Sequence, residues 1–205
     1  MVARRFGREG FSVALIARNR EKLDALAAEL QSEGIEAKRY VAEVRDRAAL
    51  VPALDAAADL GPIEVLQHSP VPNPAFLKPV LETTPEDLQA AAGFSILGPV
   101  TAIRHVLPGM RELGRGTILL PNGSSAAAPN GAVAGTSVAF AGESAYGAML
   151  HEALKPVGIH VGQLIIAGWT DGGEPAYASA ALAERLWGFH TERGALRAVA
   201  GDDQS

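Results

Sequence analysis

The stretch FSVALIA, residues 11–17, decides the fold class of this chain. It is short, apolar and partly β-branched, which is the pattern of a strand buried on both faces of a parallel sheet. Residues 20–33 then place Leu23, Leu26, Ala27 and Leu30 on one helical face, and Gly34 supplies a stop signal. A buried strand followed at once by such a helix indicates a βαβ unit.

The alternation of strand and helix continues along the chain. Further strands are expected at 37–42, 63–66, 117–120 and 158–166. Further helices are expected at 46–60, 85–92, 94–112, from about 135 to 154, and 178–190, with Asp46 capping the first of these. Pro108 should kink the helix at 94–112 or end it early. The connections at 70–79, 122–135 and 168–174 read as loops, and 201–205 as a frayed tail. We therefore expect a single, three-layer α/β domain over residues 1–205, with a doubly wound parallel sheet.

Composition excludes several classes of function. The chain has 205 residues, is 48% hydrophobic and 20% charged, and carries a formal net charge of −5. Its basic residues are dispersed and outnumbered, which gives no support to binding of nucleic acid or an anionic membrane. It has no cysteine, so disulfides and thiolate metal sites are excluded. The apolar stretches are shorter than the roughly 20 residues of a membrane span, and the first residues lack the apolar core of a signal peptide. A soluble, cytoplasmic protein is expected.

Four phrases, in order, resemble the short-chain dehydrogenase/reductase family. They are VARRFGREGFSVALIARNREKL at 2–23, GPIEVLQHSP at 61–70, GPVTAIRHVLPGMRELGRGTILL at 98–120 and LHEALKPVGIHVGQLIIAGWT at 150–170. The resemblance implies a Rossmann-like fold, with residues 1–60 as the remaining cofactor-binding half and 61–200 as the active-site half with the C-terminal helix. It also implies an NAD(P)-dependent oxidoreductase that acts on a small carbonyl or alcohol and forms homodimers or homotetramers through its two long helices.

The family pattern is incomplete at its beginning. The family starts with a strand and a glycine-rich turn, whose backbone approaches the cofactor pyrophosphate at a helix N-terminus. No GxxxGxG or GxGxxG occurs in this chain, and Gly7 and Gly10 read as a loop at the far end of the first helix. The absent strand would lie between those at 11–17 and 63–66, leaving both with unpaired edges in the middle of the sheet. Truncation, a misassigned start codon or a reduced protein would each explain this; we favour a misassigned or shortened start.

The family's catalytic residues are replaced as well. In the family a tyrosine donates a proton to the carbonyl, and a lysine four residues later lowers the tyrosine pKa. Alignment places Thr136 at the tyrosine position, Phe140 at the lysine position and Ser95 at that of a supporting asparagine. Gly123 takes the place of the active-site serine, with Ser124 next to it. An aliphatic hydroxyl is a far weaker acid than a phenol, so Ser124 and Thr136 are catalytic candidates by position only; a serine in such a loop is more often a helix cap.

Arg18 indicates which nicotinamide cofactor the chain would take. It closes the strand at 11–17, where an arginine can pair with the 2′-phosphate of NADP and an acidic residue would favour NAD. NADP(H) is therefore expected in preference to NAD(H), the alternative being a solvated arginine at the start of a helix. The resemblance gives the other cofactor contacts as Asn19, Glu43, Val44, Ser69, Pro70, Gly168, Trp169 and Thr170. No metal is expected, because His68 has no acidic or histidine partner at a ligating spacing.

Three functions remain open from the sequence. The first is an atypical NAD(P)-dependent oxidoreductase that works without the tyrosine and lysine, since hydride transfer is the cofactor's own chemistry. The second is a catalytically silent relative that binds a nucleotide or a partner. The third is a non-enzymatic oligomerising module. The resemblance favours the first, whereas the missing phosphate loop and proton donor favour the second.

Overall fold

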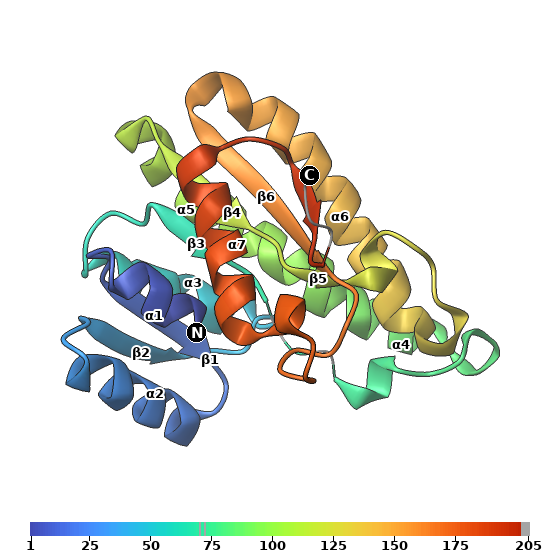
Figure 1. Ribbon diagram of the computed structural model, residues 1–205. Helices are drawn as coiled ribbons and strands as arrows, with labels where there is room; N and C mark the ends of the chain where they lie inside the picture. Colours follow the sequence, from blue (N-terminus) through green and yellow to red (C-terminus); the bar gives the residue numbers. More distant parts are fainter. Residues whose placement is uncertain (70, 72, 202–205) are drawn as a thin grey trace.

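The protein forms a three-layer α/β domain (Figure 1). The computed structural model describes residues 1–69, 71 and 73–201. Its strands are β1 (Val13–Ala17), β2 (Ala37–Val41), β3 (Val65–Gln67), β4 (Gly116–Leu119), β5 (Asn122–Gly123), β6 (Ile159–Ile166) and β7 (Arg197–Val199). Its α-helices are α1 (Val2–Gly7), α2 (Arg20–Ser32), α3 (Arg47–Ala58), α4 (Pro85–Ala92), α5 (Gly98–Leu113), α6 (Ala134–Leu154) and α7 (Ser179–Glu192). The expected Rossmann-like α/β class is confirmed.

All strand pairings are parallel, but they form two separate groups. β1 pairs only with β2, while β3, β4, β6 and β5 follow one another and β7 joins β6. Within the described residues no pairing connects β1 to β3. The unpaired edges expected from the sequence are therefore present in the middle of the sheet.

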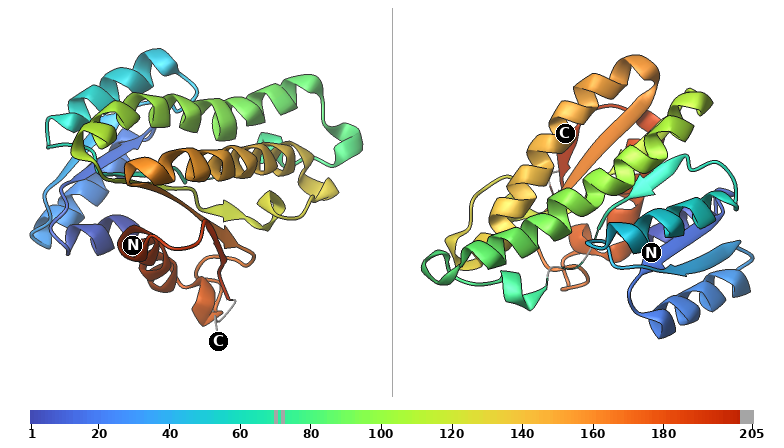
Figure 2. Two further views of the ribbon diagram at one scale, coloured as in Figure 1. Left: turned by 90° about the horizontal axis from the view of Figure 1, so that it is seen from above. Right: turned by 180° about the vertical axis from the view of Figure 1, so that it is seen from behind.

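Helices cover both faces of this divided sheet. The left panel of Figure 2 shows α3, α5 and α6 on one side and α1 and α7 on the other. β4 and all but the last residue of β6 are buried, and the largest apolar cluster joins them to α3 and α5. The centre of the core is thus the β4–β6 pair.

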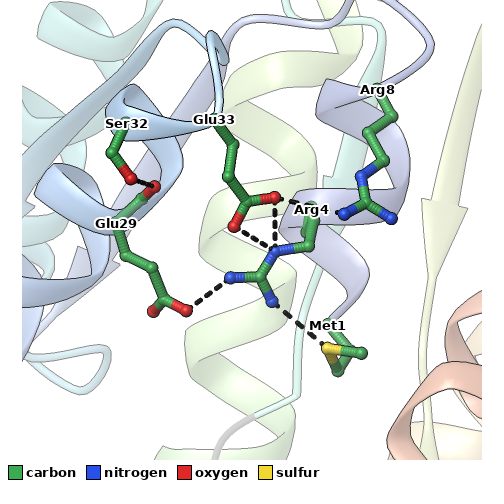
Figure 3. A network of polar contacts seen from close by, with 6 residues as sticks. All are labelled: Met1, Arg4, Arg8, Glu29, Ser32 and Glu33. Carbon is green, nitrogen blue, oxygen red and sulfur yellow. Dashed lines mark hydrogen bonds and ion pairs between the residues drawn. The ribbon is translucent and has the colours of Figure 1, made fainter.

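The first helix is fastened to its neighbours by ion pairs. Figure 3 shows Arg4 of α1 between two acidic residues of α2 and the turn after it. The Arg4 Nε lies 2.6 Å from Glu33 Oε1, and a terminal nitrogen lies 2.5 Å from Glu29. On the other side, Arg5 lies 2.7 Å from Glu184 of α7 and stacks over the Trp187 ring. These contacts hold α1 in place over the edge of β1.

Local signals account for several helix ends. The Asp46 carboxylate accepts hydrogen bonds from the amides of Ala48 and Ala49 and so caps α3, as expected. Helix α2 ends before Gly34, whose φ of 80° lies in the left-handed region that favours glycine. Each of these helix ends is determined by residues next to it in the sequence, so the sequence could predict it.

Four details differ from the sequence expectation. A π-helical turn, Gly93–Leu97, occupies the start of the expected helix at 94–112. Helix α5 continues through Pro108 to Leu113, so the early end did not occur, because buried Ile103 and Met110 hold the helix on both sides of the proline. The expected loop at 122–135 contains β5, and β7 was missed; both are short strands that exist by pairing with β6.

One helical stretch is apolar enough to be compared with a membrane span. Residues Pro85–Leu113 pass a test of length and composition, and 44% of their most apolar window is buried inside the protein. Helix α4 packs on α6, and α5 packs on α3. Core helices of globular proteins satisfy the same test, so this stretch is weak evidence for a membrane.

Candidate functional site

Three strand ends bring expected site residues to one cavity. β1, β2 and β3 finish at the same edge of the sheet, and Arg18, Glu43 and Ser69 follow within two residues of the strand ends. All three, together with Val44, line a cavity of about 880 Å³ that extends between β1 and β3. The carboxyl edge of a doubly wound sheet is where ligands bind in this class of fold. Pro70, also expected here, lies outside the described residues.

Arg18 and Glu43 form an ion pair at the mouth of this cavity. The guanidinium lies 3.3 Å from the Glu43 carboxylate, and the Arg18 side chain is 59% exposed. Burial opposes the charged form of Glu43, but hydrogen bonds from Arg45 and the charges of Arg45 and Arg18 keep its pKa below the ordinary value. A ligand phosphate at this point would therefore share Arg18 with a carboxylate.

Asn19 and the loop at 168–170 lie away from this cavity. Asn19 caps α2, where its side-chain oxygen accepts a hydrogen bond from the Lys22 amide. Gly168 packs against the Tyr177 ring, and Trp169 is 88% exposed. Neither Asn19 nor Gly168, Trp169 or Thr170 is among the residues that line the cavity. The structure thus brings together only part of the expected cofactor set.

The loop after Thr170 is attached to the next helix. The Asp171 carboxylate accepts hydrogen bonds from the amide and the hydroxyl of Ser179, at the start of α7. This residue also has a φ of 58°. Asp171 therefore caps α7 from a distance and fixes the path of the preceding loop.

The two expected catalytic hydroxyls occupy different environments. Ser124 is exposed in a 3-10 turn after β5, and its carbonyl, not its hydroxyl, accepts from the amides of Ala127 and Ala128. Thr136 is buried in the first turns of α6, and its hydroxyl has no partner among the described residues. Phe140, one turn further along α6, packs with Ala126 and Ile165. Within the described residues no hydrogen bond connects Ser124 with Thr136, and the expected capping role of the serine is not observed either.

A buried acid–histidine pair lies near these residues and was not expected. The Nε2 atom of His68, just after β3, lies 4.0 Å from Oε1 of Glu143 in α6. The two side chains are only 10% and 4% exposed, and neither of these atoms has a hydrogen-bond partner in the described part of the chain. His68 does have an acidic neighbour, in space rather than in sequence. Among the described residues no third histidine, aspartate or glutamate joins this pair in a group that could hold a metal ion.

Burial makes both members of this pair uncharged at neutral pH. Desolvation raises the pKa of Glu143 to about 8, with a hydrogen bond from Asn122 opposing it. Desolvation also lowers the pKa of His68 to about 4, opposed by a hydrogen bond to the Phe94 backbone. A protonated carboxyl and a neutral imidazole are the forms that low-dielectric surroundings favour. A glutamate on the otherwise buried face of α6 was the sequence signal for this pair.

Comparison with known proteins agrees with this architecture. A sequence model of the family described as short chain dehydrogenase matches residues 1–168. A curated relative, 3-dehydrosphinganine reductase TSC10A of Arabidopsis thaliana, is 30% identical over 113 residues, which are 54% of this chain and 32% of that protein. The first curated relatives are matched over 32% to 61% of their own length.

Solved structures share the fold over nearly the whole chain. A short-chain dehydrogenase from Rhodopseudomonas palustris superposes with a TM-score of 0.85 at 24% identity, covering 98% of this chain and 92% of that one. An NADPH-bound short-chain oxidoreductase from Pseudomonas aeruginosa PAO1, described as containing an atypical catalytic centre, gives 0.81 at 19% identity and covers 100% and 92%. At these identities the likeness establishes the fold alone.

Proposed function

The chain belongs to the short-chain dehydrogenase/reductase family, and from that premise we propose that it is an atypical member with a preference for NADP(H) over NAD(H). In this proposal Thr136 and Phe140 replace the family's catalytic tyrosine and lysine, and the substrate is a small carbonyl or alcohol. The observation that carries it is the position of Arg18, beside Glu43 and Val44, at the mouth of the cavity on the carboxyl edge of the sheet. We place its activity in the cytoplasm.

The residues present suit one end of the cofactor better than the other. Arg18 offers a guanidinium to a 2′-phosphate, and Val44 offers an apolar contact to an adenine at the same cavity mouth. At the side of the cavity where the diphosphate would lie, α1 has six residues and no side-chain cap, so we assign it no contact with the diphosphate. The nicotinamide would supply hydride transfer when bound.

Titration with NADPH and NADH tests cofactor binding directly. We expect NADPH to bind the 205-residue chain weakly, with a Kd of about 0.1 mM or above, because Arg18 would share its charge between the phosphate and Glu43. Calorimetry would measure this. A Kd near 1 μM would contradict the idea that these residues form a cofactor-deficient site.

Replacing Arg18 tests the preference for the 2′-phosphate. Arg18→Ala should weaken NADPH binding about tenfold, the value of one charge-assisted contact, and leave NADH binding nearly unchanged. Saturation-transfer NMR can compare both cofactors even when binding is weak. Arg20→Ala, in the first turn of α2, is the matched control and should change neither affinity. Equal weakening of NADH and NADPH binding by Arg18→Ala would contradict the assignment of Arg18 to the 2′-phosphate.

Turnover separates an atypical enzyme from a silent relative. A positioned general acid contributes about 10²–10⁴ in rate, so carbonyl reduction should be at least about a hundred times slower than in a relative that has the tyrosine and lysine. NADPH oxidation over a panel of carbonyl substrates would measure this. Rates equal to those of the relative would show that another group donates the proton. Binding of NADPH without any turnover would favour the catalytically silent alternative.

The surface of the long helices supports a homo-oligomer. Val138 and Met149 of α6 are 58% and 65% exposed, and eleven residues, close to three helical turns, separate them. Leu97, at the start of α5, is 62% exposed. Large apolar side chains in such positions are typical of subunit contacts. Light scattering would show whether a dimer or tetramer forms.

A further inference from the structure

The buried His68–Glu143 pair leaves two polar atoms that face one another without a partner. The pair joins the end of β3 to α6, and His68 Nε2 lies 4.0 Å from Glu143 Oε1. Both atoms are buried, and neither has a hydrogen-bond partner within the described residues. Buried polar atoms of native proteins are almost always hydrogen-bonded. We therefore asked which hydrogen bond the two side chains can form with one another.

The imidazole of His68 can only accept a hydrogen bond from Glu143. The hydrogen bond between His68 and the Phe94 backbone raises the pKa of the ring, as a bond donated to a carbonyl does. Because Nε2 has no partner, the donor of this bond is Nδ1. A neutral ring with its hydrogen on Nδ1 has a lone pair and no hydrogen on Nε2.

The carboxyl of Glu143 can supply the matching donor. A hydrogen bond from the Asn122 side chain reaches one carboxyl oxygen, and since Oε1 has no partner this oxygen is Oε2. The Asn122 amide also donates to the Leu120 carbonyl, so its direction is fixed from two sides. Only a protonated Oε1 can donate to the lone pair of His68. Burial of Glu143 favours that protonated form.

We infer that Glu143 Oε1 donates a hydrogen bond to His68 Nε2 that fastens α6 to the end of β3, and that removal of this one proton releases the contact. We call this hydrogen bond the latch. A rotation of the carboxyl that shortens the 4.0 Å separation by about 1.2 Å gives an ordinary hydrogen-bond length. Hydrogen bonds then connect, without a gap, Phe94, His68, Glu143, Asn122 and Leu120.

Two titrations of opposite sign limit the pH range of the closed latch. Burial raises the pKa of Glu143 to about 8, so above this pH the donor is lost and a carboxylate faces the lone pair of His68. Burial lowers the pKa of His68 to about 4, so below this pH Nε2 carries a proton and no longer accepts. The groups that face the pair from the π-helical turn and from β5 are neutral, namely the Phe94 carbonyl and the Asn122 amide. In the described part of the chain no charged side chain contributes to either shift. The latch is closed between about pH 4 and pH 8.

Opening of the latch acts on the turn after β3. His68 and Ser69 of this turn line the 880 Å³ cavity beside Glu43 and Arg18. The His68 amide donates to the Leu119 carbonyl, which keeps the end of β3 on β4. The change is therefore expected in the His68 side chain and at Ser69, on one wall of the cavity. This inference needs no cofactor and is independent of the proposed function.

NMR of the whole 205-residue chain, labelled with ¹⁵N, tests the latch between pH 6 and pH 9.5. The ring nitrogens show which of them carries the hydrogen, and the amides of His68 and Ser69 report on the turn. His68→Gln removes one of five histidine ring signals and so assigns it. Glu143→Gln is the closed reference, because its amide can donate to His68 Nε2 at every pH and its oxygen can accept from Asn122. Glu143→Leu, which is similar in volume and has no donor, is the open reference.

The expected result is a transition of the parent protein from the closed to the open reference. At pH 6 the parent should match Glu143→Gln, and at pH 9.5 it should match Glu143→Leu, with the hydrogen on His68 Nδ1 throughout. The midpoint for the Nε2 signal and the two amides should lie near pH 8, where His68 itself does not titrate. Glu143→Gln should show no such midpoint. Glu152→Gln, exposed on the same helix, is the matched control and should titrate as the parent does.

Three results would overturn the inference. A hydrogen on Nε2 of His68 at pH 6 would mean that the ring donates to an ionised Glu143. Signals of the parent that do not change between pH 6 and pH 9.5 would mean that the proton does not control the contact. The same midpoint in Glu143→Gln would assign the titration to another group.

Discussion

Glu143→Gln should raise the free energy of unfolding at pH 9 by about 4–5 kcal/mol and change it little at pH 4. Burial raises the pKa of Glu143 from 4.5 to about 8 in the folded protein. A group with a raised folded pKa contributes stability that is fully present below its unfolded pKa and lost as the pH rises through the folded pKa. Each pH unit between 4.5 and 8 costs about 1.4 kcal/mol, and glutamine avoids this cost because it does not ionise.

Urea unfolding of both proteins between pH 4 and pH 9 would measure the effect. The difference between variant and parent should grow from about pH 4.5 to pH 8 and then stay constant. His68 titrates with the opposite sign, since its lowered pKa makes its contribution disappear as the pH falls towards 4. That contribution is common to both proteins and largely cancels in the difference. Glu152→Gln, at an exposed position of the same helix, is the control for replacing a glutamate of α6. Parallel stability curves for Glu143→Gln and its parent would mean that Glu143 is ionised in the fold.

The fold was predictable where its signals are local. FSVALIA correctly predicts a strand, although the expected burial is wrong because no residue of β1 is buried, and Asp46 predicts a helix start because its own side chain makes the cap. β5 and β7 could not be predicted in this way. Each is two or three residues long and exists only because it pairs with β6, far away along the chain. Short strands are fixed by tertiary pairing, which has no periodic signature.

The candidate site also has residues that could be predicted from local signals and residues that could not. Arg18, Glu43 and Ser69 could be expected together because each follows a strand, and parallel strands end at one edge. The His68–Glu143 pair could not, because 75 positions separate its members and their approach depends on how α6 packs over the end of β3. No acidic residue lies at a ligating spacing from His68 along the sequence, but the packing of α6 brings Glu143 next to it.

Phe140→Ala should lower the free energy of unfolding by about 3–5 kcal/mol, the usual cost of removing a buried aromatic side chain. The Phe140 ring is 8% exposed and packs with Ala126 and Ile165, which connects α6 to the turn after β5 and to the end of β6. A Cβ added at Gly123 would lie 3.5 Å from the ring, an ordinary contact distance, so the ring lies close to the position of the family's serine. This side chain acts by packing.

Substitutions that differ in volume or in exposure test that role. Phe140→Leu keeps most of the apolar volume and should cost less than half as much as Phe140→Ala, whereas Glu152→Ala, exposed on the same helix, should change stability by less than about 0.5 kcal/mol. Urea unfolding at pH 5 keeps Glu143 protonated and isolates the packing effect. NADPH affinity should be the same in all variants, because Phe140 does not line the cavity. A loss below 1 kcal/mol for Phe140→Ala, or a change in NADPH affinity without a loss of stability, would instead place this residue at the cofactor, where the family has its lysine.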